Sequence, residues 1–180
     1  MTHALHDVIR AGTAAVVLAS VSGGAALAQS VPDRGVFVSQ IGNTNRAVVT
    51  QRNVDDRAAI TQDGEDNETE LVQEGSGPKT AQITQDGNGN SVSARQEGEG
   101  ATELSIGQTG DDNSAAVLQR ETGSGVATVA AIQQSGNGNR LVLVQDGSDN
   151  QADLSQTGDD NTMTATQLNS GNTSENKMML

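Results

Sequence analysis

The stretch Gln40-Ile41-Gly42-Asn43-Thr44-Asn45-Arg46-Ala47-Val48-Val49-Thr50-Gln51 sets the architecture of this chain, because its pattern recurs. The pattern Gln-x-Gly-x-x-Asn-(x)5-Gln occurs in six copies, which begin at Gln40, Gln62, Gln85, Gln108, Gln134 and Gln156. A repeat of about 22 residues with fixed polar positions predicts a stacked solenoid. Each copy would form one layer of the stack, which we call a rung.

Each rung divides into two half-turns, and each half-turn ends on a glutamine. Successive glutamines are 11 or 12 residues apart, except for 15 residues between Gln119 and Gln134. Small or aliphatic residues recur at every second position before each glutamine, as Val49 and Ala47 do before Gln51. This period of two predicts strands with one buried face.

A helix is the alternative interpretation of an 11-residue repeat. Glycine two residues after the first glutamine of every copy would break such a helix at each turn. The sequence therefore predicts an all-β fold, a β-solenoid of about six strand-turn-strand rungs.

The recurrent polar residues are the candidate functional residues. The turn glycines are expected to supply backbone angles that other residues resist, and the turn asparagines to tolerate the left-handed region. Stacking in register predicts amide ladders, in which each side chain donates to one neighbouring rung and accepts from the other. The ladder residues are Gln40, Asn45, Gln51, Gln62, Asn67, Gln73, Gln85, Asn90, Gln96, Gln108, Asn113, Gln119, Gln134, Asn139, Gln145, Gln156, Asn161 and Gln167, and the turn glycines are Gly42, Gly64, Gly87, Gly110, Gly136 and Gly158.

Acidic residues fill the turn between glycine and asparagine in every second rung. They are Glu65, Asp66, Asp111, Asp112, Asp159 and Asp160, whereas rungs one, three and five are neutral at these positions. Alternation separates like charges by about 10 Å, close to a Debye length. We interpret these acids as gatekeepers that slow premature aggregation. The alternatives are a plain solvated acidic surface and calcium binding, although the Gly-Gly-x-Gly-x-Asp pattern of calcium β-rolls is absent.

Composition excludes several classes of function. The net charge of -13 argues against partners such as nucleic acid or an anionic membrane surface. The repeats contain no His, Cys, Tyr or Trp, because His3 and His6 precede them. The usual general base, thiol nucleophile and soft metal ligands are therefore missing, which predicts no enzyme and no cofactor. Carboxylate catalysis on a solenoid would need a cleft, which a slim stack does not offer.

Residues 1–28 have the pattern of a secretory signal peptide. Arg10 precedes an apolar stretch, and Ala26-Leu27-Ala28 is an A-x-A-type cleavage site. A membrane anchor is the alternative, but the stretch is short and contains Gly and Ser. We therefore expect an exported chain without membrane insertion, with a leader at 29–35 and a solenoid at 36–180. No cap is recognisable at either end, so the open edges are expected to accept identical chains.

The quoted pattern closely resembles the curlin repeat of curli subunits, over about residues 36–172. The resemblance implies a secreted bacterial functional amyloid that polymerises, by way of the periplasm, into cell-surface fibres for biofilm matrix, adhesion and colonisation. It implies a major subunit or a minor nucleator, with a companion curlin subunit and export or chaperone machinery as partners. In that family the repeat Gln and Asn form the amyloid-core ladders. The alternative is a monomeric secreted β-solenoid adhesin or binding domain, which would need capped ends and a continuous ligand stripe.

Overall fold

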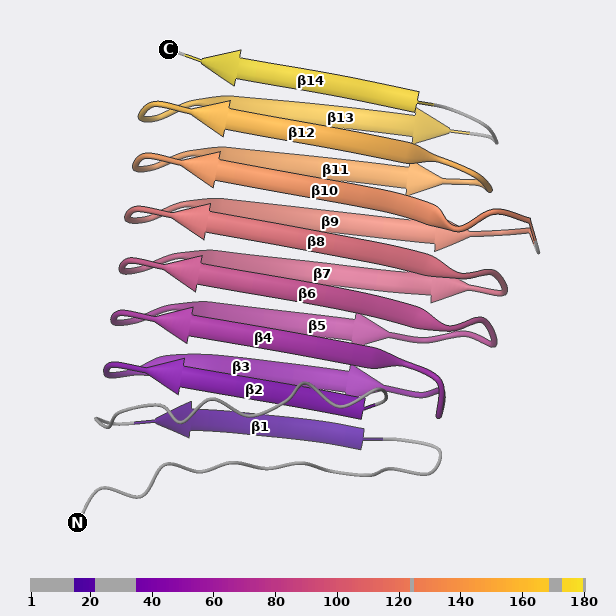
Figure 1. Cartoon of the computed structure of the whole chain (residues 1–180), viewed down its shortest axis with the longest axis horizontal. Coiled ribbons are helices and arrows are strands. Elements are labelled where there is room, and N and C mark those ends of the chain that lie inside the picture. The colour runs from indigo at the N-terminus through magenta and orange to yellow at the C-terminus, as the bar shows by residue number, and fades with distance from the viewer. Residues whose placement is uncertain (1–14, 22–34, 124, 169–172, 180) are drawn as a thin grey trace.

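The computed structural model describes residues 15–21, 35–123, 125–168 and 173–179. Their fourteen strands form two seven-stranded sheets that face each other as two layers (Figure 1). The chain crosses from one layer to the other at every turn, so even-numbered strands form one sheet and odd-numbered strands the other. The predicted all-β solenoid is confirmed.

The even-numbered sheet contains β2 (Gly35–Ile41), β4 (Arg57–Asp63), β6 (Lys79–Asp86), β8 (Thr102–Thr109), β10 (Thr128–Ser135), β12 (Gln151–Thr157) and β14 (Thr173–Met179). The odd-numbered sheet contains β1 (Ala15–Val21), β3 (Asn45–Gln51), β5 (Glu68–Gln73), β7 (Ser91–Gly98), β9 (Ser114–Glu121), β11 (Arg140–Asp146) and β13 (Thr162–Leu168). Strands β2 to β13 make six rungs, and β14 adds half a rung. The predicted number of rungs is therefore confirmed.

Neighbouring strands from β2 onward are parallel, and each repeat position lies beside its equivalent. Gln40 pairs with Gln62, and Gln62 pairs with Gln85. The long connection between β9 and β10 is absorbed as a loop, because Gln108 still pairs with Gln134. A fixed register follows from the period of two, since a slip of one residue would expose the buried face.

The core is the thin space between the two sheets. Ala58 and Ile60 of β4 and Leu71 of β5 are fully buried, as the alternation predicts. At the turns, Gly64 has a φ of +119°, and a Cβ built there would lie 2.0 Å from the carbonyl oxygen of Gly87. The close approach of successive rungs therefore requires glycine. Two residues later, Asp66 has a φ of 58°, in the left-handed region that Asp tolerates.

The outermost strands differ at the two ends of the stack. At the N-terminal end, β2 is the edge of its sheet, and β1 pairs antiparallel with the outer edge of β3. At the C-terminal end, β14 pairs with β12, and β13 is the edge of its sheet. The sequence predicts no cap, but β1 covers β3 in the full chain. β1 lies within the predicted signal peptide, most of which, like the leader, lies outside the described residues. No helix in the described ranges could cross a bilayer.

Candidate functional site

Two columns of buried glutamine run the length of the stack, one in each sheet. In the even-numbered sheet, Nε2 of Gln62 donates to Oε1 of Gln85 over 2.8 Å, and Gln85 donates to Gln108 over 3.0 Å. In the odd-numbered sheet, Gln73 donates to Gln96 over 2.8 Å. The same donation links all five steps of each column. In all ten of these bonds the amide donates toward the C-terminal end.

The glutamine amides also bind the two layers together. Nε2 of Gln62 donates to the main-chain oxygen of Arg46 in the opposite sheet, over 3.1 Å. Nε2 of Gln73 makes the equivalent bond to the oxygen of Arg57. Each ladder glutamine from Gln62 to Gln145 therefore donates one amide hydrogen along the stack and the other across it, so that the buried amide is fully used.

The first turn leads from each even-numbered strand to the next odd-numbered one. Its asparagines bond mainly to backbone atoms of the next rung, whereas the sequence predicts bonds between their side chains. Oδ1 of Asn45 accepts the main-chain N–H of Asn67 over 3.0 Å, and Nδ2 of Asn45 donates to the carbonyl of Gly64 over 2.9 Å. Side chain to side chain bonds occur only at two steps, from Asn113 to Asn90 and from Asn139 to Asn113, among the described residues. The asparagines mainly satisfy the backbone of the next turn, which a repeat pattern alone does not reveal.

The last asparagine of this ladder has an unsatisfied acceptor. Asn161 is 2% exposed, and its Oδ1 has no hydrogen-bond partner among the described residues. In each earlier rung the same atom accepts the N–H of the next asparagine. A further rung stacked on β13 would supply the missing donor. A buried acceptor without a hydrogen bond costs about 1–3 kcal/mol of stability.

The acidic and neutral turns contact each other along the stack. Nδ2 of Asn43 donates to Oε1 of Glu65 over 3.0 Å, and Nδ2 of Asn137 donates to Oδ1 of Asp159 over 3.2 Å. The main-chain N–H of Asp111 in turn donates to Oδ1 of Asn137 over 2.9 Å. The gatekeeper candidates are thus exposed acids, and the side chains of Glu65, Asp66, Asp111 and Asp159 also bond to the neighbouring turn. Within the described ranges, no three acidic or histidine side chains gather as a metal site would require.

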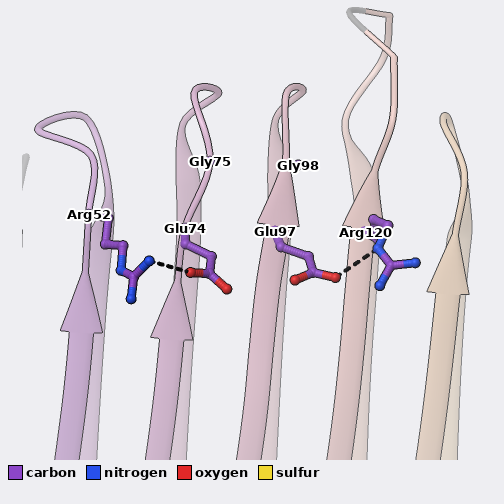
Figure 2. A pocket seen from close by; sticks show the side chains of 6 residues that line it. All are labelled: Arg52, Glu74, Gly75, Glu97, Gly98 and Arg120. Carbon is purple, nitrogen blue, oxygen red and sulfur yellow. Dashed lines mark hydrogen bonds and ion pairs between the residues drawn. The ribbon is translucent and has the colours of Figure 1, made fainter.

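A row of paired arginine and glutamate side chains follows the odd-numbered sheet at the ends of its strands (Figure 2). Arg52 contacts Glu74 at 3.1 Å, Arg95 contacts both Glu74 and Glu97, and Arg120 contacts Glu97 at 2.7 Å. Hydrogen bonds from Arg95 and Arg120 lower the pKa of Glu97 below its ordinary value. The same contacts raise the pKa of both arginines. Networks of this kind stabilise more than isolated surface pairs.

The second turn, which leads from each odd-numbered strand to the next even-numbered one, holds buried charges that were not predicted. Asp56, Lys79 and Glu121 are all 1% exposed or less. Burial raises the pKa of Asp56 and lowers the pKa of Lys79. Asp56 and Lys79 stand six residues before a ladder glutamine, where the first turn always has asparagine. That alignment of the two half-turns is the sequence signal that could have found them.

Comparison with known proteins identifies the repeat. Residues 136–168, which include β11, β12 and β13, match the family model described as the curlin associated repeat. The predicted resemblance to the curlin repeat is therefore confirmed by this match, in a chain that folds as a β-solenoid. No curated protein and no solved structure matches the chain significantly.

Proposed function

We propose that this protein is a secreted structural subunit that polymerises with itself into curli-type amyloid fibres outside the cell. The observation that carries the proposal is the unsatisfied Oδ1 of Asn161 beside the open edge of β13. Five identical steps show which donor this atom takes, namely the main-chain N–H of an asparagine in the next rung. In a second copy stacked on this end, the main-chain N–H of Asn45 in rung one would be that donor.

The chemistry of the turns also supports addition of a second copy. Rung six is acidic at Asp159 and Asp160, and rung one is neutral at Asn43 and Thr44. Stacking rung one of one chain on rung six of another would continue the alternation that links turns within the chain. The glutamine columns would continue in the same way, since rungs one and six carry the same ladder residues.

Stacking of a second copy requires that the outermost strands change at both ends of the stack. β1 covers β3 in the full chain, and removal of the predicted signal peptide would uncover it. β14 covers β12, so a second copy must displace β14 to pair both of its strands. We propose that the fibre lies on a bacterial surface in a biofilm matrix. A companion curlin subunit and export or chaperone machinery would assist it, and no catalysis would be involved.

The direct test is to incubate purified residues 29–180 and to follow thioflavin fluorescence and fibre diffraction. We expect fibres whose diffraction shows spacings of about 4.8 Å between strands and about 10 Å between sheets. A stable soluble monomer would instead support the monomeric adhesin. Asn45→Ala should slow fibre elongation, whereas Ser93→Ala, on the outward face of β7, should leave it unchanged.

A further inference from the structure

The ladders make the rungs nearly interchangeable. Both glutamine columns and the asparagine column present the same residue in every rung, and the even-numbered sheet repeats almost the same core pair, such as Ala58 and Ile60 or Ala81 and Ile83. A rung that was skipped, with rung three stacked directly on rung one, would rebuild the same ladders. Uniform ladders therefore hold rungs together without specifying their order.

The second turn supplies a column that differs from rung to rung. At the position six residues before the ladder glutamine it has Asp56, Lys79, Thr102, Thr128 and Asn150. Asp56, Lys79 and Thr128 take over parts of the bonding of the first-turn asparagines. Oδ1 of Asp56 accepts the main-chain N–H of Lys79 over 3.0 Å, as Asn45 does for Asn67.

The side chain of Lys79 donates to the next turn as an asparagine side chain does, but it accepts no bond from that turn. Its Nζ donates to the carbonyl oxygens of Gly98 over 3.1 Å and Gly100 over 2.7 Å, both in the next turn. Because an ammonium cannot accept, the N–H of Thr102 instead donates to the carbonyl of Pro78 over 3.2 Å. Lys79 thus fits between a turn that carries an acceptor and a turn built from glycines.

Glu121 lies outside this column, beside Thr128 at the turn between β9 and β10, and is also buried. Its carboxylate accepts from the N–H of Gly123 at 2.9 Å, the hydroxyl of Thr128 at 2.5 Å and the N–H of Asp149 at 3.3 Å. A Cβ at Gly100 would lie 2.2 Å from Cγ of Glu121, so this carboxylate packs directly against the turn that receives Lys79. The three buried charges therefore alternate in sign along the stack, with the turn of Gly98 and Gly100 between Lys79 and Glu121.

We propose that Asp56, Lys79 and Glu121 specify the order in which the rungs stack. Each bonds within its own turn and also makes at least one hydrogen bond to the turn beside it in the observed order. Skipping rung two would take the ammonium of Lys79 away from the buried carboxylate of Asp56 and from the carbonyl oxygens of Gly98 and Gly100. A buried charge that loses its partners is strongly destabilising, whereas the ladders do not register the change. This role of the buried charges belongs to the folding of one chain and does not depend on fibre formation.

Cysteine pairs can test the order of the rungs, because the natural chain has no cysteine. Thr61 and Thr84 pair across β4 and β6 on the outward face, so Thr61→Cys with Thr84→Cys should form a disulfide in the observed order. Ser39 and Thr84 lie two rungs apart, about 10 Å, which is too far for a disulfide. Ser39→Cys with Thr84→Cys reports a skipped rung, and intramolecular products are read on the monomer band after denaturation.

The decisive variant is Asp56→Asn with Lys79→Asn and Glu121→Gln, because asparagine at the first two positions can rebuild the ladder of the first turn. We expect its β-sheet content to persist and its Ser39–Thr84 crosslink to rise about tenfold or more. Arg46→Gln with Glu68→Gln and Asp153→Asn is the control, since it makes the same change in net charge on the exposed faces and should add no such crosslink.

A variant that keeps its sheet content and still forms only the Thr61–Thr84 crosslink would overturn the proposal. If the triple variant does not fold, Asp56→Asn with Lys79→Asn gives the same readout with Glu121 in place. Failure of both to fold would also overturn the proposal, because the charges would then be needed for stability and not for order.

Discussion

The side-chain amide of Asn88 donates to Oδ1 of Asp111, one rung further along the stack, over 3.1 Å. The same oxygen accepts the main-chain N–H of Asn88 over 2.8 Å. The alternation of neutral and acidic turns is therefore an alternation of donors and acceptors as well as a spacing of charges. A carboxylate that accepts two such bonds is stabilised where a stacked pair of carboxylates would repel.

Replacing that donor with an acid should weaken the stack. Asn88→Asp would place three acidic turns in succession, with like charges about 4.8 Å apart. We expect a loss of about 1 kcal/mol in the free energy of unfolding, which added salt would reduce. Urea denaturation at low and high salt measures the effect. Asn88→Ser removes the amide without adding charge, and an equal loss in both variants at every salt concentration would contradict the explanation.

The buried glutamine columns should dominate stability. Gln85→Ala would remove the acceptor of Gln62 and the donor of Gln108, and would leave a cavity. We expect a loss of about 3 kcal/mol or more. Gln82→Ala, on the exposed face of the same strand, is the matched control and should change stability by less than about 0.5 kcal/mol. Similar urea midpoints for the two variants would show that the column contributes little.

The acidic turns should set the rate of assembly. Asp111→Asn with Asp112→Asn preserves the left-handed turn, because Asn tolerates that conformation, and removes two negative charges. If these residues are gatekeepers, the lag before thioflavin fluorescence should shorten several-fold relative to the unmodified chain. The difference should disappear in high salt, where charge repulsion is screened. A lag that is the same in both proteins at low salt would favour the plain acidic surface.

The charge row of Figure 2 predicts a dependence on acid. Arginine contacts lower the pKa of Glu97 in the folded state below the ordinary value of 4.5. The unfolded chain therefore takes up this proton first as the pH falls, and stability drops through the range from 4.5 down to the folded value. Above that range the contribution is complete.

Glu97→Gln isolates this effect. The difference in unfolding free energy between the unmodified chain and the variant should be constant above about pH 5 and shrink at lower pH. Urea titrations at several pH values give the comparison. A difference that does not change with pH would mean that Glu97 acts through packing and not through its charge.

The regular part of this molecule was predictable because residues with strong conformational or burial preferences recur at fixed positions in each repeat. Gly64 and its equivalents mark turns, and Val49 and Ala47 mark a buried face, so strands, rungs and glutamine columns follow. The bonding of Asn45 to backbone was less accessible, since a repeat shows which residues align but not which atoms meet. Asp56, Lys79 and Glu121 were missed because the second turn has different residues in different rungs. A repeat pattern indicates only the positions at which the same residue recurs.

The direction of the glutamine columns gives the molecule a head and a tail. Because every glutamine–glutamine bond in both columns is donated toward the C-terminal end, and the strands from β2 onward all run parallel within their sheets, no rotation makes the two ends equivalent. Two copies that met tail to tail would oppose their amide dipoles along both columns. A filament built from this unit would therefore be polar, with two chemically distinct tips that elongate at unequal rates.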